Sequence, residues 1–248
     1  MNSYKIYPSL LDAFQHYLDS EVDAEAFSNL DSEGNYRQTA DEIAEIRLRA
    51  LIDKINRVPV TSEAMEQGTA FNELIDAVIE ERYPMLDCHI QQICTTRYNN
   101  REWRFVAELV KKVAQYVYGS VAQTYGERVL ETAYGDVLLY GYADYILRDK
   151  IIDLKTTAYY TFGKYERGWQ RYAYPYIFGQ DMHIHSFVYL AVQMHTDILG
   201  NTGGTIYEEE YTHTSTDIAS LRNICERFIE FLNSHREQIT DLKIFGNE

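Results

Sequence analysis

A chain of 248 residues, 46% of them hydrophobic, is long enough to bury a substantial core in one large domain. Its formal net charge of -15 argues against a protein that binds nucleic acid over its whole surface, because Lys and Arg drive phosphate binding. The net charge does not exclude a local basic channel on an otherwise acidic protein. The candidate residues for such a channel are Arg97, Arg101, Arg104, Lys111, Lys112, Lys164, Arg167 and Arg171.

The sequence lacks the features of an exported or membrane protein. No apolar run approaches the roughly eighteen residues that a membrane helix requires, and the N-terminus has no basic and apolar signal segment. Cys88, Cys94 and Cys225 are few, odd in number and unclustered, which argues against a disulfide framework. We therefore expect a cytoplasmic protein with no membrane contact.

The first half of the chain is expected to be mainly helical, because apolar residues recur at helical spacing behind residues that favour helix N-termini. In chain order we expect a helix from Pro8 to Leu18, a polar loop from Asp23 to Arg37, a helix that Thr39 caps and that ends before Pro59, a helix from Thr61 or Ser62 to about Arg82, a shorter helix from Leu86 to Thr95 and a long helix from Trp103 to Gln123.

After Gly126 the spacing of apolar residues changes to alternation, which predicts strands. We expect a three-stranded meander built from a strand at Arg128 to Tyr134, a turn at Gly135 and Asp136, and a hairpin around a turn at residues 148–150. The elements expected beyond it are a helix from Glu166 to Phe178, a buried strand from His185 to Gln193, an edge strand from Thr205 to Thr212 and a helix from Asp217 to about His235.

Periodicity alone therefore predicts an α/β fold with a mixed sheet. No repeat, linker or low-complexity segment marks a second domain. We expect residues 1–248 to form one domain, mainly helical over about 1–125, with the sheet core and a C-terminal helix over 126–248.

Three charged residues interrupt the apolar strands of the hairpin between Leu139 and Thr157. A charged side chain in a core strand costs several kcal/mol unless it is paired or binds a metal. Asp153 and Lys155 are two residues apart and project from the same face, and the hairpin carries Asp144 close to Asp153. The pattern predicts two carboxylates and one ammonium in a small volume.

Metal-assisted hydrolysis is the chemistry that such a group suits. Mg²⁺ is usually held by one or two carboxylates together with water and substrate phosphate, and a nearby Lys can orient the attacking water. The alternative is an Asp–Lys ion pair that only stabilises the hairpin, which is the commoner meaning of an isolated D-x-K.

The surrounding residues form a wider pattern of G-x-x-D, a turn, D-L-K-T-T and a downstream Q-x-x-x-Y. This pattern resembles the PD-(D/E)XK nuclease superfamily, and most closely its RecB-type and phage exonuclease branch, over residues from about 7 to about 196. The residues that carry the resemblance are Gly141, Asp144, Asp153, Leu154, Lys155, Thr156, Thr157, Gln170 and Tyr174.

Residues 68–73, GTAFNE, resemble the helical motif that supplies a further metal ligand in this branch. The RecB-type pattern has His four residues after Gly68, where this chain has Asn72, followed by Glu73. On a helical wheel Asn72 falls at the edge of the apolar stripe and Glu73 nearly opposite. Geometry favours Asn72 as the residue that faces the sheet, and charge favours Glu73 as a ligand for a hard cation, so both stay open.

The resemblance implies a restriction-endonuclease-like core, a mixed central β-sheet flanked by helices, with additional N-terminal helices. It further implies a Mg²⁺- or Mn²⁺-dependent DNA exonuclease that acts at the ends of linear duplex in recombination, repair or phage replication. In this reading the metal ligands are Asp144, Asp153 and either Glu73 or Asn72, and the catalytic residues are Asp144, Asp153, Lys155, Gln170 and Tyr174.

Related nucleases that hold an iron–sulfur cluster use four Cys, so with three we expect no cluster. A recombination partner protein and a homo-oligomer stay open. The competing hypothesis is a catalytically silent nuclease-like domain that binds nucleic acid or a partner protein.

Tyrosines are numerous around the proposed site. They could stack on unpaired bases, although core packing explains most of them more simply. This group consists of Tyr140, Tyr142, Tyr159, Tyr160, Tyr165, Tyr172, Tyr174 and Tyr176.

Overall fold

The computed structural model of the protein describes residues 3–24, 29–82 and 92–246. Its strands are β1 (Ser3–Ile6), β2 (Ile93–Tyr98), β3 (Arg101–Val106), β4 (Val121–Thr132), β5 (Gly135–Leu147), β6 (Lys150–Thr157), β7 (Ser186–Thr196) and β8 (Asn201–Thr212). Its helices are α1 (Pro8–Leu18), α2 (Ser20–Ala24), α3 (Ala40–Ile55), α4 (Glu63–Ile79), α5 (Ala107–Tyr116), α6 (Gln170–Met182) and α7 (Ser215–Ser234), followed by the short 3₁₀ helices η2 (Arg236–Gln238) and η3 (Leu242–Phe245).

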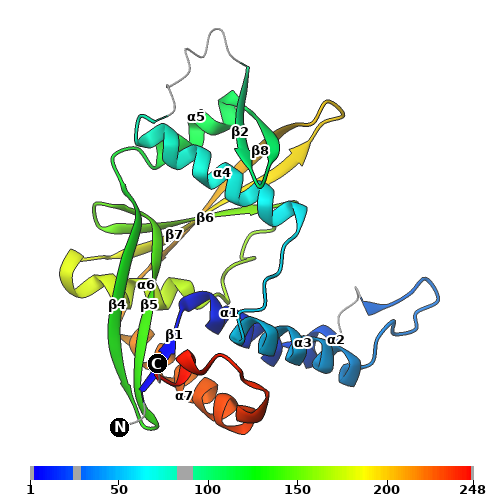
Figure 1. The fold of residues 1–248 in the computed structure, drawn as a ribbon, viewed down its shortest axis with the longest axis vertical. Helices are drawn as coiled ribbons and strands as arrows, with labels where there is room; N and C mark the ends of the chain where they lie inside the picture. Colours follow the sequence, from blue (N-terminus) through cyan, green and yellow to red (C-terminus); the bar gives the residue numbers. More distant parts are fainter. Residues whose placement is uncertain (1–2, 25–28, 83–91, 247–248) are drawn as a thin grey trace.

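Within these residues the strands form one mixed eight-stranded sheet in the order β1-β5-β6-β7-β8-β3-β2, with β4 paired to β5 (Figure 1). The β4–β5 and β5–β6 pairs are antiparallel, which confirms the meander, while β1–β5, β6–β7 and β3–β8 are parallel. Strand β7 is buried on both faces of the sheet, and this explains its continuous apolar sequence.

Two hydrophobic cores lie on opposite faces of the sheet. Helices α1, α3, α6 and α7 build the larger core, in which Phe14, Phe187 and Phe228 are buried. Helices α4 and α5 build the other, around Phe71 and Phe105. This arrangement of a mixed sheet between helices is the predicted restriction-endonuclease-like core.

The N-terminal helices begin where their capping residues predict. Thr39 and Glu42 form a capping box at the start of α3, and the Ser62 hydroxyl accepts the Met65 N–H at the start of α4. Helix α1 begins at Pro8 as expected, and α7 covers the predicted C-terminal helix. In the described part of the chain, no helix has both the length and the apolar character needed to cross a membrane.

The prediction of one long helix from Trp103 to Gln123 is wrong. The segment consists of most of β3, then α5, then the first residues of β4. Trp103 and Phe105 are buried on one side of a strand, with exposed residues between and before them, so this stretch has a period of two. Gly119, with φ of 81°, separates α5 from β4.

Other boundaries also differ from expectation. Strand β2 replaces the end of the helix expected from Leu86 to Thr95, while residues 86–91 lie outside the described part. The expected loop from Asp23 starts inside α2, and α6 begins at Gln170, four residues later than predicted. The β4–β5 turn falls at residues 133–134 rather than at Gly135 and Asp136. Strand β8 is an edge only in part, because Asn201 and Thr202 pair with β3.

Candidate active site

The candidate site lies at a gap along one edge of β5. Strand β1 pairs with Asp136 to Leu139 on β5, and β6 pairs with Tyr145 to Leu147. The β5 residues between these two ladders have no strand partner on that edge within the described structure. The Asp144 carboxylate fills part of the gap, since its Oδ2 accepts the Leu154 N–H of β6 at 2.9 Å.

Strands β4 and β5 bend together at Asp144. Gln123, which would face Asp144 in the ladder, has a left-handed φ of 46°. Ala143 packs into the core formed with α6, whereas Tyr145 packs into the core formed with α4, although residues two apart on a regular strand share a face. The bend therefore turns the strand over and directs Asp144 into a cavity of about 710 Å³ beside α4.

Asp153 and Lys155 lie next to each other on β6, as their spacing predicted. The Asp153 side chain is buried, and its Oδ2 lies 2.6 Å from the Lys155 Nζ as an ion pair without regular hydrogen-bond geometry. Burial lowers the pKa of Lys155, but Asp153, Asp144 and Asp12 outweigh burial and raise it. The ammonium is therefore protonated at neutral pH and cannot act as a general base.

Gln170 is fixed between Lys155 and a carboxylate from α1. Its Oε1 accepts a hydrogen bond from Lys155 Nζ at 3.1 Å, and its Nε2 donates to Asp12 Oδ2 at 2.6 Å. Because Asp12 takes the amide N–H, the amide oxygen is turned toward the lysine. Asp12 was not singled out in the sequence, where it is one polar residue of an amphipathic helix; only the packing of α1 against α6 reveals it.

Tyr174 lies one helical turn beyond Gln170 and is buried over Gly141. A Cβ on Gly141 would lie 3.1 Å from the Tyr174 ring, so the ring sits directly against the β5 backbone. Burial and the charges of Asp153, Asp144 and Asp12 raise the pKa of the phenol. The hydroxyl therefore stays protonated and can donate a hydrogen bond near the two carboxylates.

The two carboxylates approach the gap from different sides. Asp153 lies two residues after Ile151 on β6, so both side chains face the α6 side of the sheet. Asp144 faces α4. The two carboxylates nonetheless interact. Burial first and the negative charge of Asp153 second raise the pKa of Asp144 to about 7. A divalent cation would relieve this crowding of negative charge, so the residues present fit a metal.

The α4 residues that face the cavity include both alternatives left open by the sequence. Asn72 and Glu73 line it; the Asn72 Oδ1 is buried without a hydrogen-bond partner, whereas Glu73 is exposed. Asp76, one turn after Asn72, also lines it and accepts hydrogen bonds from Tyr145 at 2.7 Å and Gln123 at 3.2 Å. Asp76 was missed because the helical motif that carries the resemblance on α4 ends at residue 73.

Oxygen atoms dominate this donor set, as Mg²⁺ and Mn²⁺ prefer. Among the residues that the structure describes, no three His, Cys, Asp or Glu side chains form a group able to hold a metal. A cation here would use the two carboxylates and the unpartnered Asn72 oxygen, with water and substrate completing its shell.

The remaining sequence candidates divide between different places. Lys164 and Arg167 line a second cavity of about 420 Å³, which shares Lys155 with the first. Arg101 pairs with Glu63 at the N-terminal end of α4. The tyrosines divide as well: Tyr174 and Tyr176 are buried, while Tyr142 and Tyr159 are 59% and 68% exposed. Cys88 lies outside the described residues.

Comparison with known proteins gives distant structural similarity only. No family and no curated protein sequence matches this chain. The solved structure of the protein SSO0001 is 13% identical, with a TM-score of 0.38, and the match covers 75% of this chain and 87% of that one. A candidate exonuclease from Eubacterium rectale is 12% identical, with a TM-score of 0.42 and coverage of 76% and 74%. We therefore base the function on the geometry of the site.

Proposed function

We propose that this protein is a Mg²⁺- or Mn²⁺-dependent DNA nuclease. The observation that carries the proposal is the gap in the sheet, where Asp144 and Lys155 line an open cavity and the Lys155 ammonium also pairs with the buried carboxylate of Asp153. An acid in a cleft whose pKa is raised by burial and by a neighbouring acid is typical of functional sites.

Each side chain has a part in hydrolysis of a phosphodiester. Asp144, Asp153 and Asn72 would hold the cation, which supplies a water of lowered pKa and offsets charge on the phosphate. Lys155 stays protonated and so orients the attacking water and stabilises the charge that builds on the phosphate. Gln170 holds the Lys155 ammonium in place, and Asp12 holds Gln170. Tyr174 offers a hydrogen-bond donor at the same gap.

The finer assignment to an exonuclease acting at DNA ends, in recombination, repair or phage replication, is supported by the sequence pattern alone. The competing proposal is a catalytically silent domain that binds nucleic acid or a partner. The Asp153–Lys155 ion pair favours it, because a buried carboxylate paired with an ammonium is also the arrangement of a purely structural ion pair.

Purified full-length protein should be incubated with linear duplex DNA and with covalently closed circular DNA, in Mg²⁺, in Mn²⁺ and in EDTA. We expect nucleotide release from the linear DNA with either metal, none in EDTA, and none from the circle. Asp144→Asn is the control and should be inactive yet folded. Cleavage of the circle would identify an endonuclease, and absence of cleavage in every condition would support the silent domain.

A further inference from the structure

An open face of β4 and β5 leads away from the candidate active site. Tyr142 and Asp144 both project from the side of β5 opposite Ala143, and Tyr142 is paired across the ladder with Tyr125. These two tyrosines are 59% and 48% exposed, and their ring centroids are 5.2 Å apart. The same side continues to Tyr140 and Leu138, so the face begins beside Asp144 and carries exposed aromatic rings.

A pocket rich in positive charge lies at the far end of this face. It has a volume of about 460 Å³ and is lined by Lys5, Arg57 and Lys243 together with Tyr125, Tyr140, Leu138 and Glu127. Lys5 comes from β1, Arg57 from the end of α3 and Lys243 from η3, so three distant segments bring their cations to one place. This group of three cationic side chains contrasts with the net charge of -15 of the chain.

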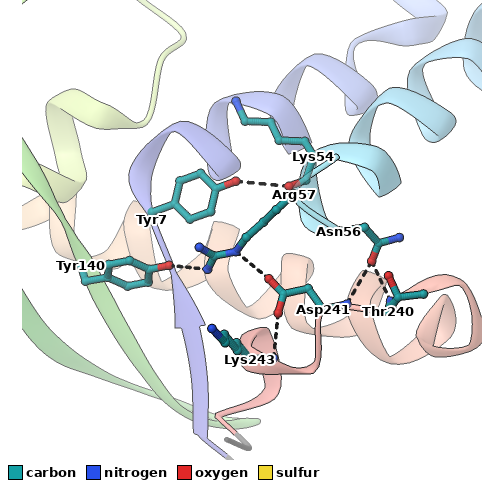
Figure 2. Close-up of polar contacts among 8 residues, drawn as sticks. All are labelled: Tyr7, Lys54, Asn56, Arg57, Tyr140, Thr240, Asp241 and Lys243. Carbon is teal, nitrogen blue, oxygen red and sulfur yellow. Dashed lines mark hydrogen bonds and ion pairs between the residues drawn. The ribbon is translucent and has the colours of Figure 1, made fainter. Parts of the chain in front are cut away.

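Arg57 is held in a fixed position in this pocket (Figure 2). Its Nε contacts Asp241 Oδ2 at 2.6 Å, its Nη2 donates to the Tyr140 hydroxyl at 3.0 Å, and its guanidinium lies 5.9 Å from the centre of the Tyr7 ring. A guanidinium has five N–H donors, so these contacts leave donors for a further acceptor. Arg57 is still 52% exposed.

The surrounding backbone is built to hold this arrangement. Arg57 has a left-handed φ of 55°, a conformation that costs a residue with a side chain about 1 kcal/mol or more. The Asn56 side chain ties the C-terminal segment to α3, because its Oδ1 accepts the Thr240 N–H at 2.7 Å (Figure 2). Its Nδ2 also donates to the Gln238 carbonyl at 2.9 Å. This tie places Asp241 against Arg57.

We propose that this face binds single-stranded DNA, with bases stacked on Tyr142 and Tyr125 and a backbone phosphate in the pocket of Lys5, Arg57 and Lys243. Asp144 lies six positions along β5 from Leu138 at the pocket, a path of roughly 20 Å that several nucleotides span. The strand that enters the pocket thus reaches the carboxylates. This direction of the strand rests on the proposed nuclease function, whereas the binding itself does not.

The chemistry of the face favours an unpaired strand over other ligands. Exposed aromatic rings stack on bases whose faces are free, which a duplex does not offer. The one acid that lines the pocket, Glu127, accepts a hydrogen bond from the Tyr125 hydroxyl, so part of its charge is already engaged. An acidic peptide would use the cations but would leave the tyrosines without a role.

The test is fluorescence anisotropy with a labelled oligodeoxythymidylate, in EDTA so that no cleavage occurs, on wild-type protein and four variants. Tyr142→Ala should raise the Kd about tenfold, the loss typical of one stacked base. Lys243→Gln should raise the Kd and reduce the slope of log K against log salt by about 0.7, the value for one phosphate contact on a single strand. The matched controls are Tyr36→Ala, 61% exposed, and Lys150→Gln, 38% exposed, on other parts of the surface.

The proposal is overturned if the wild-type protein does not bind the oligonucleotide, or if Tyr142→Ala and Lys243→Gln bind it with the same Kd as the control variants. It is also overturned if these two substitutions weaken the binding of duplex DNA only. These results are separable from failure of the nuclease proposal. A protein that binds the strand through these residues but never cleaves DNA keeps the binding face and loses the activity. If the wild-type protein cleaves linear DNA while both variants bind the oligonucleotide normally, the nuclease proposal stands and the proposed binding face on β4 and β5 is wrong.

Discussion

Asp144 is about half protonated at pH 7 in the absence of metal, because burial and Asp153 raise its pKa to about 7. The unfolded chain releases this proton above about pH 4. The folded state thus binds more protons between about pH 4 and 7, so this group's contribution to stability falls as pH rises through that window. Asp144→Asn should remove that loss, and at pH 8 its unfolding free energy should exceed that of the parent by up to about 4 kcal/mol.

Chemical denaturation of both proteins in EDTA at several pH values measures the difference directly, since groups common to both cancel. The advantage of Asp144→Asn should grow from pH 4 to pH 7 and then stay constant. An advantage that shrinks as pH rises would show that the Asp144 carboxylate is stabilised, not destabilised, in its charged form.

Asp12 is expected to act through Gln170 as a positioning residue, since it holds the amide that contacts Lys155. Asp12→Ala frees the amide and should slow DNA cleavage about tenfold to a hundredfold, as loss of an outer-shell partner does. Asp12→Asn keeps a hydrogen-bond acceptor and should restore most of the rate. We expect the change in kcat, with KM nearly constant; equal rates for all three proteins would remove Asp12 from the site.

The sequence identified those site residues whose chemistry conflicts with their surroundings. Charges within an apolar hairpin are costly, so Asp144, Asp153 and Lys155 could be found without a structure. Asp12 and Asp76 could not, because each is an ordinary polar residue on a helix and reaches the site only through tertiary packing. The bend at Asp144 was equally invisible, since it depends on the left-handed backbone of Gln123.

Helix α4 approaches β6 very closely at Gly68. A Cβ there would lie 2.5 Å from the Thr156 Oγ1, so Gly68→Ala should push α4 away from β6 and cost about 1–3 kcal/mol. The shift should also weaken metal binding, because α4 carries Asn72. Gly179 on α6 is a matched control: nothing lies within 4 Å of its added Cβ, and Gly179→Ala should stabilise by up to about 1 kcal/mol.

Denaturant unfolding and calorimetric Mg²⁺ titration of these two variants check this prediction. If Gly68→Ala is as stable as the parent and binds metal equally well, close packing of α4 on β6 does not set the geometry of the site.

At the scale of elements, strong periodicity and capping predicted α1, α3, α4, α7 and the meander correctly. The errors fall where short elements follow one another. Trp103 and Phe105 alternate for only six residues before the helical spacing of Leu109 and Val113 begins, so a helical window absorbs the strand. Strand β1 is four residues long and pairs with a strand far along the chain, which local sequence does not reveal.

For the whole molecule, the central claim is that the Asp144, Asp153 and Lys155 group is a hydrolytic centre and not a structural ion pair. Lys155 separates these meanings, because its ammonium cannot bind a cation and acts mainly in the transition state. A structural ion pair, by contrast, leaves a buried Asp153 charge unpaired when the lysine is removed.

The decisive measurement is the rate of linear DNA cleavage in Mg²⁺ by Lys155→Ala, with Lys150→Ala as control and unfolding free energy measured on the same samples. We expect Lys155→Ala to cleave roughly two to four powers of ten more slowly, while it remains folded and binds metal and DNA nearly as the parent does. Cleavage at the parental rate, or a loss of about 3 to 5 kcal/mol of stability as the main effect, would contradict the catalytic assignment.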